Sequence, residues 1–236
     1  IHGFCENAEM WIDMMDRLSD DYDSLAIDLP GFGKNNALPP HVSISDMAEW
    51  IKSNFINEKV AVIGHSMGGY VGLDLLENHR EFIGGLSLFH SNAHEDNAAK
   101  KESRLKTIDF IRNNSKEPFL QLFVKDLLSN ENDQNEDWLS SLYEQVAQTS
   151  TEAIVSSLKA MMNRKDYIVE LGNLKIPIQY VIGTKDKMYP AAEMLKQASV
   201  LQAGVVNLVD SGHLSSLENP DAAEAAIREF LDEVYP

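Results

Sequence analysis

The chain has 236 residues, 44% of them hydrophobic, and can bury a sizeable core either as one α/β domain or as a domain with a large insertion. Its 20 Lys and Arg residues stand against 37 Asp and Glu residues, and the net charge of -17 would repel phosphate backbones and anionic lipid headgroups. Nucleic acid is therefore not expected as a partner, and no apolar run is long enough to span a membrane.

Strand and helix patterns alternate over residues 1–90. They predict, in order, the end of a strand at 1–4, a helix over 8–18, a short buried strand over 24–29 closed by the turn 30–33, a helix over 44–55, a strand over 60–63, a helix from 70, and a strand over 82–89. Ser43 or Ser45 is expected to cap the second of these helices. The alternation predicts a mostly parallel sheet with helices on both faces.

The segment Val60–Tyr70 reads VAVIGHSMGGY and contains G-x-S-x-G between an apolar run and a stretch with helical spacing. This pattern of strand, sharp turn and helix is typical of a nucleophile elbow. Ser66 would lie at the apex in a strained conformation, and glycine at 64 and 68 would remove side chains that clash. The N–H groups that begin the helix, with Met67 first, would be directed toward a developing oxyanion.

From 95 to 165 the sequence contains only helical signals. They predict helices over 98–111, from Pro118, over 138–146 and over 153–162. So long a stretch without a strand predicts an inserted helical lid. Within it, the acidic connector Asn130–Asp137 is expected to be a solvated loop.

Strand signals return in the last part of the chain. They predict a strand over 176–183, a loop over 184–190, a helix over 191–199, a strand over 205–209, a loop over 211–213 and a closing helix over 221–234. Asn219 or Asp221 is expected to cap the last helix, with Pro220 in its first turn.

Five short motifs occur in an order that is typical of one family. They are HGF at 2–4, DLPGFG at 28–33, GHSMGG at 64–69, GTKD at 183–186 and SGH at 211–213. With them the chain resembles the α/β-hydrolase family over almost its whole length. The resemblance implies an α/β-hydrolase fold, a mostly parallel sheet flanked by helices, with a core formed by 1–90 and 170–236 and a helical lid formed by 91–169.

The resemblance also assigns the roles of a catalytic triad to Ser66, Asp186 and His213. A serine hydroxyl is a poor nucleophile near neutral pH, so a histidine must take its proton and an ionised carboxylate must hold the imidazole in one tautomer. The family stabilises the oxyanion with two N–H groups, which correspond here to those of Phe4 and Met67.

Other residues compete for these roles. Asp210 lies only three residues before His213 and is too close to reach around the ring easily, so Asp186 is favoured as the acid. Some family members place the acid after the sixth strand, where this chain has Ser91 and Asn92. Cys5 lies beside the predicted oxyanion loop, but because a serine occupies the elbow it is interpreted as a small packing residue.

The remaining histidines suggest no catalytic chemistry of their own. His41 and His79 are expected at the surface, and His65 and His90 are expected to line the substrate pocket, with His90 at its mouth. His90 and His94 are four residues apart, a spacing that on a helix could indicate metal ligands, but no further His or Cys completes a site. Neither a metal nor a cofactor is therefore expected.

A serine at the elbow excludes dehalogenases and epoxide hydrolases, which need a carboxylate there. The resemblance therefore implies hydrolysis of a small carboxylic ester or thioester through an acyl-serine intermediate, with the lid shaping a pocket for a small-molecule acyl substrate. Two alternatives stay open: cleavage of a carbon–carbon bond in a vinylogous diketone, and a ligand sensor that keeps the triad and signals by lid movement. An aminopeptidase would need lid carboxylates to hold a substrate ammonium, and nothing in the sequence positions them.

Two further expectations concern location and the start of the chain. One cysteine excludes an internal disulfide and fits a reducing compartment, so with no signal peptide visible a cytoplasmic location is expected. The chain begins at Ile1 without a methionine, and the family's fold has strands before HGF, so about twenty to thirty further residues are expected to precede it. No oligomeric state is predicted.

Overall fold

The computed structural model describes residues 1–37, 42–202 and 204–236. His41, expected at the surface, lies outside the described residues. The strands of the described chain are β1 (Val60–His65), β2 (Ile83–Phe89), β3 (Ile178–Gly183) and β4 (Gly204–Val209). The helices before the insertion are η1 (Ala8–Trp11), α1 (Ile12–Leu18), α2 (Ile44–Phe55), α3 (Met67–Asn78) and η2 (Arg80–Phe82). Those after it are α8 (Ile168–Leu171), α9 (Ala191–Ala198), α10 (Ser215–Glu218) and α11 (Pro220–Val234).

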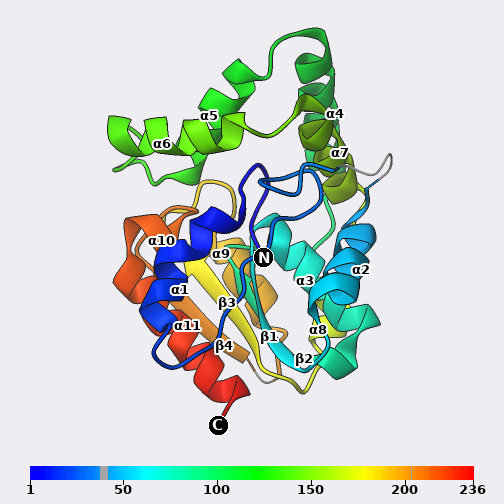
Figure 1. Ribbon diagram of the computed structural model, residues 1–236, viewed down its shortest axis with the longest axis vertical. Helices are drawn as coiled ribbons and strands as arrows, with labels where there is room; N and C mark the ends of the chain where they lie inside the picture. The colour runs from blue at the N-terminus through cyan, green and yellow to red at the C-terminus, as the bar shows by residue number, and fades with distance from the viewer. Residues whose placement is uncertain (38–41, 203) are drawn as a thin grey trace.

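The four strands form one parallel sheet in the order β1-β2-β3-β4 (Figure 1). One apolar cluster joins α1 and α11 to one face of this sheet, and a larger one joins α2, α3 and α9 to the other face. The predicted α/β-hydrolase fold, with a mostly parallel sheet flanked by helices, is confirmed.

The register of the sheet brings the carboxyl ends of its strands to one edge. His65 is level with Phe89 in the β1–β2 pair, and Gly183 is level with Val209 in the β3–β4 pair. Ligand sites in open α/β sheets lie beyond the carboxyl ends of the strands, because the loops that follow those ends converge there. The loops after the four strands carry Ser66, His90, Asp186 and His213.

Helix caps form largely where the sequence indicated. Ser43 caps α2 in a full capping box with Asp46, and Asn219 caps α11. Two helices of a single turn, α8 and α10, were not predicted. No helix among the described residues has the length and apolar character needed to cross a membrane.

The four helices predicted after β2 are present, and the short α8 follows them before β3: α4 (Ala98–Asn113), α5 (Glu117–Leu127), α6 (Glu136–Ala147) and α7 (Thr151–Met162). Figure 1 shows them together at one end of the molecule. The division of the chain into a core and a lid over 91–169 stays a prediction.

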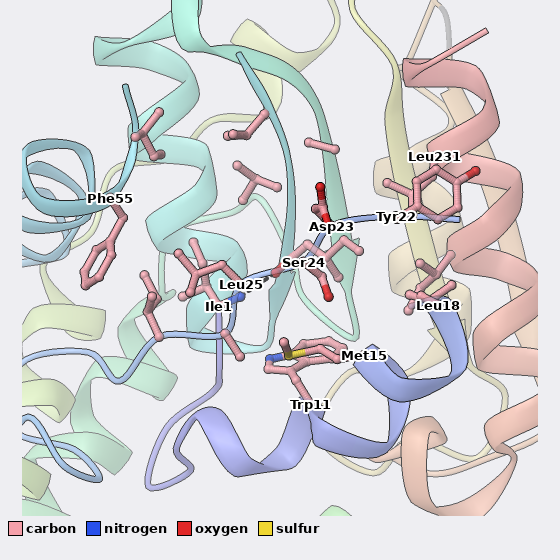
Figure 2. A pocket seen from close by; sticks show the side chains of 18 of the residues that line it. Ile1, Trp11, Met15, Leu18, Tyr22, Asp23, Ser24, Leu25, Phe55 and Leu231 are labelled. Atoms are coloured by element: carbon pink, nitrogen blue, oxygen red, sulfur yellow. Dashed lines mark hydrogen bonds between the residues drawn. The ribbon is translucent and has the colours of Figure 1, made fainter. Parts of the chain in front are cut away.

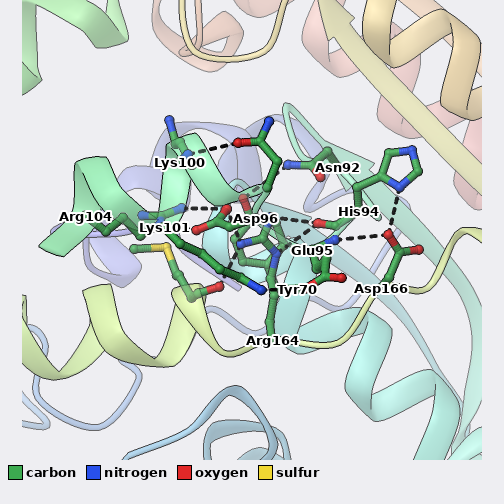
Figure 3. Close-up of polar contacts among 12 residues, drawn as sticks. Tyr70, Asn92, His94, Glu95, Asp96, Lys100, Lys101, Arg104, Arg164 and Asp166 are labelled. Carbon is green, nitrogen blue, oxygen red and sulfur yellow. Dashed lines mark hydrogen bonds and ion pairs between the residues drawn. The ribbon is translucent and has the colours of Figure 1, made fainter.

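Buried charges tie the two ends of this insertion together (Figure 3). Asp96, just before α4, bonds Arg104 of α4 and accepts a 2.6 Å hydrogen bond from Nη1 of Arg164, which follows α7. Arg164 also donates to the carbonyl oxygen of His94 at 2.7 Å. Burial alone would raise the pKa of Asp96, but the two guanidinium groups hold it below its usual value. Charged groups that are buried and paired in this way are costly to separate, so the base of the insertion is firmly anchored.

The strand predicted over Ser24–Leu29 is wrong: these residues belong to no strand of the described sheet. Leu25 is 65% exposed, while Ile27 and Leu29 are buried. A strand requires a hydrogen-bonded neighbour, and a cavity of about 770 Å³ lies between this segment and the outer edge of β1. Figure 2 shows Ile1, Trp11, Ser24, Leu25 and Phe55 among its lining residues.

Candidate active site

Ser66 occupies the turn between β1 and α3, in a conformation that few residues adopt. Its φ is 49° and its ψ is -113°, a left-handed geometry that costs an L-residue about 1–3 kcal/mol. A Cβ on Gly64 would lie 2.5 Å from the carbonyl oxygen of Gly68, and a Cβ on Gly68 would lie 2.5 Å from that of Ile1. Glycine is therefore required on both sides of the serine.

The end of the neighbouring strand β2 holds the strained turn in place. The N–H of Ser66 donates to the carbonyl oxygen of Phe89 at 3.0 Å, and the hydroxyl of Ser91 donates to the carbonyl oxygen of Ser66 at 2.7 Å. Both main-chain groups of the serine are thus fixed, and its position is determined by the sheet.

Asp186 and His213 come together from the loops after β3 and β4. Nδ1 of His213 lies 2.7 Å from Oδ2 of Asp186. The other carboxylate oxygen, Oδ1, accepts hydrogen bonds from the N–H groups of Met188 at 2.7 Å and Tyr189 at 3.0 Å. The carboxylate is thus held by three donors, and it orients the imidazole through one of them.

Nε2 of His213 is buried and has no hydrogen-bond partner among the residues that the structure describes. A buried polar atom without a partner is costly, and at functional sites such atoms commonly await a substrate or a reacting group. With Nδ1 engaged by the carboxylate, Nε2 is the nitrogen positioned to accept a proton.

Charge balance keeps Asp186 ionised. Burial by itself would raise its pKa, but the charge and hydrogen bond of His213, with a smaller contribution from His90, hold the pKa well below its usual value. A carboxylate in this state can stabilise an imidazolium cation on His213.

A second buried pair lies beneath the site and was missed by the sequence analysis. Glu6 Oε2 lies 2.8 Å from Nδ1 of His65, and Nε2 of His65 lies 2.9 Å from the carbonyl oxygen of His213. Glu6 also accepts a 2.6 Å hydrogen bond from the N–H of Gly3. The residue before Ser66 therefore links the loop at the chain start to the backbone of His213.

The directions of the pKa shifts indicate that Glu6 and His65 form a charged pair. Burial would lower the pKa of His65 and raise that of Glu6, but their mutual attraction reverses both effects. The one sequence signal for this pair was an acidic residue directly after HGFC, close to a predicted oxyanion donor.

The predicted oxyanion donors lie at the expected places in the chain. Met67 is the first residue of α3, so its N–H has no acceptor one turn earlier in the helix. Phe4 is buried in the loop that Glu6 supports, and its ring contacts those of Phe119 and Phe123 on α5 at centroid distances of 6.3 and 5.5 Å. The roles of both N–H groups stay predictions.

His65 and His90 do not lie where the pocket prediction placed them. Both side chains are 0% exposed, so His90 is not at a pocket mouth. A left-handed backbone, with φ of 48°, turns residue 90 so that its ring lies beside Asp186 at the base of the site. His65 has both ring nitrogens bonded to protein groups.

The competing residues are engaged elsewhere. Asp210 has a side chain that is 69% exposed and pairs with Lys185 at 2.9 Å. His94 pairs with Asp166, and His79 pairs with Glu49. Cys5 is buried, and burial raises the pKa of its thiol, so little reactive thiolate forms.

His90, Asp186 and His213 also offer three ligand atoms within 4.8 Å of one another, a grouping that could hold a metal ion. Two of these atoms already form the 2.7 Å hydrogen bond between Asp186 and His213. The arrangement therefore fits a hydrogen-bonded acid–base pair directly, without an ion.

The insertion contacts the site at several points. The N–H of His213 donates to the carbonyl oxygen of Leu127 at the end of α5, at 2.9 Å. Ser66 is only 8% exposed and His213 only 1%. The large cavity beside β1 is lined by none of the three predicted triad residues. Ser66 and His213 are thus shielded from bulk water, and the end of α5 contacts the backbone of His213.

Comparisons with known proteins agree with the fold. Residues 1–220 match the family model described as the alpha/beta hydrolase fold. A thermophilic esterase of Thermogutta terrifontis superposes with a TM-score of 0.90 at 26% identity, over 100% of this chain and 89% of that one.

Two curated relatives also match the chain along its length. The biotin biosynthesis bifunctional protein BioHC of Teredinibacter turnerae is 25% identical over 100% of this chain, which spans 44% of that relative's length. A 2-hydroxy-6-oxo-6-(2'-aminophenyl)hexa-2,4-dienoic acid hydrolase of Metapseudomonas resinovorans is 26% identical over 98% of this chain and 82% of its own length. Since the family model covers most of the chain, this protein belongs to the α/β-hydrolase family.

Proposed function

We propose that the protein is a serine hydrolase that cleaves a small carboxylic ester or thioester through an acyl-serine intermediate. Two observations carry the proposal: Ser66 is strained at the start of α3, and the buried His213 is held by Asp186 through Nδ1 while its Nε2 has no partner among the described residues. A strained serine, an oriented imidazole and a free ring nitrogen are the parts that nucleophilic catalysis at a serine requires.

In the first half of the reaction, Oγ of Ser66 attacks the acyl carbon while its proton passes to Nε2 of His213. Asp186 stabilises the imidazolium that results. The N–H groups of Met67 and Phe4 would hold the oxyanion, and each such donor contributes about 3 kcal/mol to lowering the barrier. The imidazolium then gives its proton to the leaving alcohol or thiol.

In the second half, a water molecule gives a proton to His213 and attacks the acyl-serine. The tetrahedral intermediate collapses, the proton returns to Ser66, and the carboxylic acid leaves. Every proton is carried by His213, so no cofactor is needed.

We propose that the acyl group is small and apolar. Phe4 and α5 lie over the site, and the rings of Phe119 and Phe123 form an apolar wall against Phe4. We further propose that α4–α7 act as a lid, because α5 contacts both Phe4 and the backbone of His213. The esterase among the solved structures supports the ester substrate class.

Hydrolysis of a carbon–carbon bond is a second candidate function, because the Metapseudomonas resinovorans relative is named as a hydrolase of a hexadienoic acid. The same serine, histidine and aspartate would serve: the carbon–carbon bond would break, and the departing carbon would take the proton that His213 received from Ser66. The difference would lie in the lid side chains that contact the substrate.

The test is turnover of p-nitrophenyl esters of increasing acyl length, with thioesters and a vinylogous 1,5-diketone measured in parallel. We expect many turnovers on short acyl esters, and none with Ser66→Ala. Preference for the diketone by a factor of about a hundred or more in kcat/KM, some 2.7 kcal/mol, would favour the second candidate. At most a few turnovers on all substrates, with ligand-dependent stabilisation, would indicate a sensor and overturn the proposal.

A further inference from the structure

His90 lies beside the aspartate and histidine of the site, and no role has been assigned to it. It follows the last residue of β2, and its N–H donates to the carbonyl oxygen of Val181 on β3 at 2.9 Å. Its φ of 48° is a left-handed value that few residues adopt. The backbone is therefore fixed in a costly conformation that directs this ring into the buried space next to Asp186.

The two ring nitrogens of His90 have different neighbours. Nε2 lies 2.7 Å from the hydroxyl oxygen of Ser215, the first residue of α10. Nδ1 lies 3.6 Å from Oδ2 of Asp186, the same oxygen that His213 contacts. Within 1–37, 42–202 and 204–236, Nδ1 has no hydrogen-bond partner and is buried.

Electrostatics decides which nitrogen carries the proton. Burial lowers the pKa of His90 to about 4, so the ring is neutral near pH 7 and has a single N–H. A lone pair on Nδ1 would face the negative carboxylate and be repelled, whereas an N–H there is attracted. The hydroxyl of Ser215 can donate to Nε2 and so hold the ring in the tautomer with the proton on Nδ1.

We propose that His90 is a positioning residue whose Nδ1–H donates to Asp186 during the reaction and thereby limits how tightly Asp186 holds the proton on His213. The inference rests on the proposed serine hydrolase function. At 3.6 Å the contact is longer than a hydrogen bond. Catalytic hydrogen bonds are often long in unliganded structures and shorten in the reacting complex.

The reason is competition for one oxygen. Oδ2 of Asp186 can accept a hydrogen bond from His213 alone, or it can accept from His213 and from a second donor at the same time. Sharing weakens the attraction between Asp186 and the imidazolium, so His213 returns its proton more readily to the leaving group. Without the His90 donor, the negative charge of the Asp186 carboxylate would interact with the imidazolium of His213 alone, and that attraction would be stronger.

Other titratable groups around His213 would be unchanged in this comparison. They are Glu6, His65, Asp186 and Tyr189, the last with its ring centroid 5.4 Å from that of His213. Of the groups facing His90, the rings of His65 and His213 lie at 6.0 and 5.8 Å, and Asp186 is the carboxylate. None of them is altered by substitution at 90.

The test compares two variants of the protein. His90→Asn keeps an amide where Nδ1 stood and suits a left-handed backbone, whereas His90→Leu has no donor. We would measure kcat/KM against pH on the best ester, and the rate of fluorophosphonate labelling against pH. In His90→Leu we expect the midpoint of the acid limb to shift to higher pH by about half to one unit in both profiles. The plateau kcat of this variant should be about threefold to tenfold lower. In His90→Asn both profiles should stay near those of the parent.

Unfolding at acid pH would also move the acid limb, so the melting temperature of each variant is measured across the same pH range and rates are compared only where the protein is folded. Ser215→Ala provides a second route, since it removes the group that fixes the tautomer, and we expect a smaller shift in the same direction. An acid limb in His90→Leu within about 0.2 pH unit of the parent would overturn the proposal for His90 while leaving the hydrolase function intact. A parent protein that neither turns over esters nor takes the label would instead overturn the function itself.

Discussion

Asp186→Asn tests the acid of the site, and its consequence follows from the hydrogen bonds at each carboxylate oxygen. Oδ1 accepts from two main-chain N–H groups, at Met188 and Tyr189. The carbonyl oxygen of an asparagine amide would satisfy both. Its NH₂ group would then point at Nδ1 of His213, where Oδ2 now lies at 2.7 Å.

An amide donor at that position selects the wrong tautomer of His213. Nδ1 would have to accept a hydrogen bond, so the proton would sit on Nε2, and Nε2 could no longer take a proton from Ser66. We expect kcat to fall by roughly ten-thousand-fold, which is about 5.5 kcal/mol of transition-state stabilisation.

The assay is kcat and kcat/KM on a short p-nitrophenyl ester, with melting temperature measured to separate catalytic loss from unfolding. Asp210→Asn is the matched control, because Asp210 is an exposed aspartate that pairs with Lys185 at the surface. Such a solvent-screened surface pair contributes little to stability, and activity should stay within about twofold of the parent. The assignment of Asp186 is incorrect if Asp210→Asn is the variant that loses activity, while the kcat of Asp186→Asn stays within about tenfold of the parent, a loss under 1.4 kcal/mol.

Three further predictions concern the same buried groups. The kcat/KM of the parent should be lost on acidification, since only a neutral imidazole can accept the proton of Ser66; a rate that does not fall as the solution is made acidic would contradict this role. Ser66→Gly should be inactive but melt about 2–4 °C higher than Ser66→Ala, because glycine removes about 1–3 kcal/mol of strain and costs about 0.5–1 kcal/mol in entropy; equal melting temperatures would count against strain at this turn. Glu6→Gln should be less stable by about 2 kcal/mol near pH 6, and its melting temperature should vary less from pH 6 to 9.

The sign of this last pH dependence follows from both partners. The folded-state pKa of Glu6 is lowered, so its stabilisation is present above the unfolded value and is lost as the pH falls toward the folded one. The folded-state pKa of His65 is raised, so its stabilisation is full below the unfolded value of about 6.5 and is lost as the pH rises through the folded one. The parent should thus lose stability above neutral pH more steeply than Glu6→Gln, and parallel curves would contradict a charged pair.

Local patterns were sufficient for most elements of the fold. Apolar spacing and capping residues predicted α2, α7 and α11 to within a few residues, because the information that defines a helix lies within its own turns. The segment Ser24–Leu29 has the composition of a strand, yet a strand also requires a neighbour, and composition contains no information about what lies beside it. Helices of one turn, such as α8 and α10, are too short to produce a periodic signal.

The residues of the candidate site that belong to a short sequence motif could be predicted from the sequence. Ser66, Asp186 and His213 occur in GHSMGG, GTKD and SGH, and the order of these motifs indicated how the loops would meet. The contacts of Glu6 with His65 and of His90 with Asp186 join positions 59 and 96 residues apart. Neither pair lies in a single motif, so its existence depends on how the loops pack, and only the structure reveals it.

The central claim, that Ser66 is an activated nucleophile, is tested most directly by intact mass after exposure to a fluorophosphonate. Only a serine whose proton is removed by a neighbouring base reacts readily with such a reagent. We expect the mass of one adduct, assigned by peptide analysis to Ser66, with loss of ester turnover in proportion to labelling and with no adduct on Ser66→Ala. An adduct that persists on the alanine variant, or full ester turnover in the labelled protein, would contradict the account.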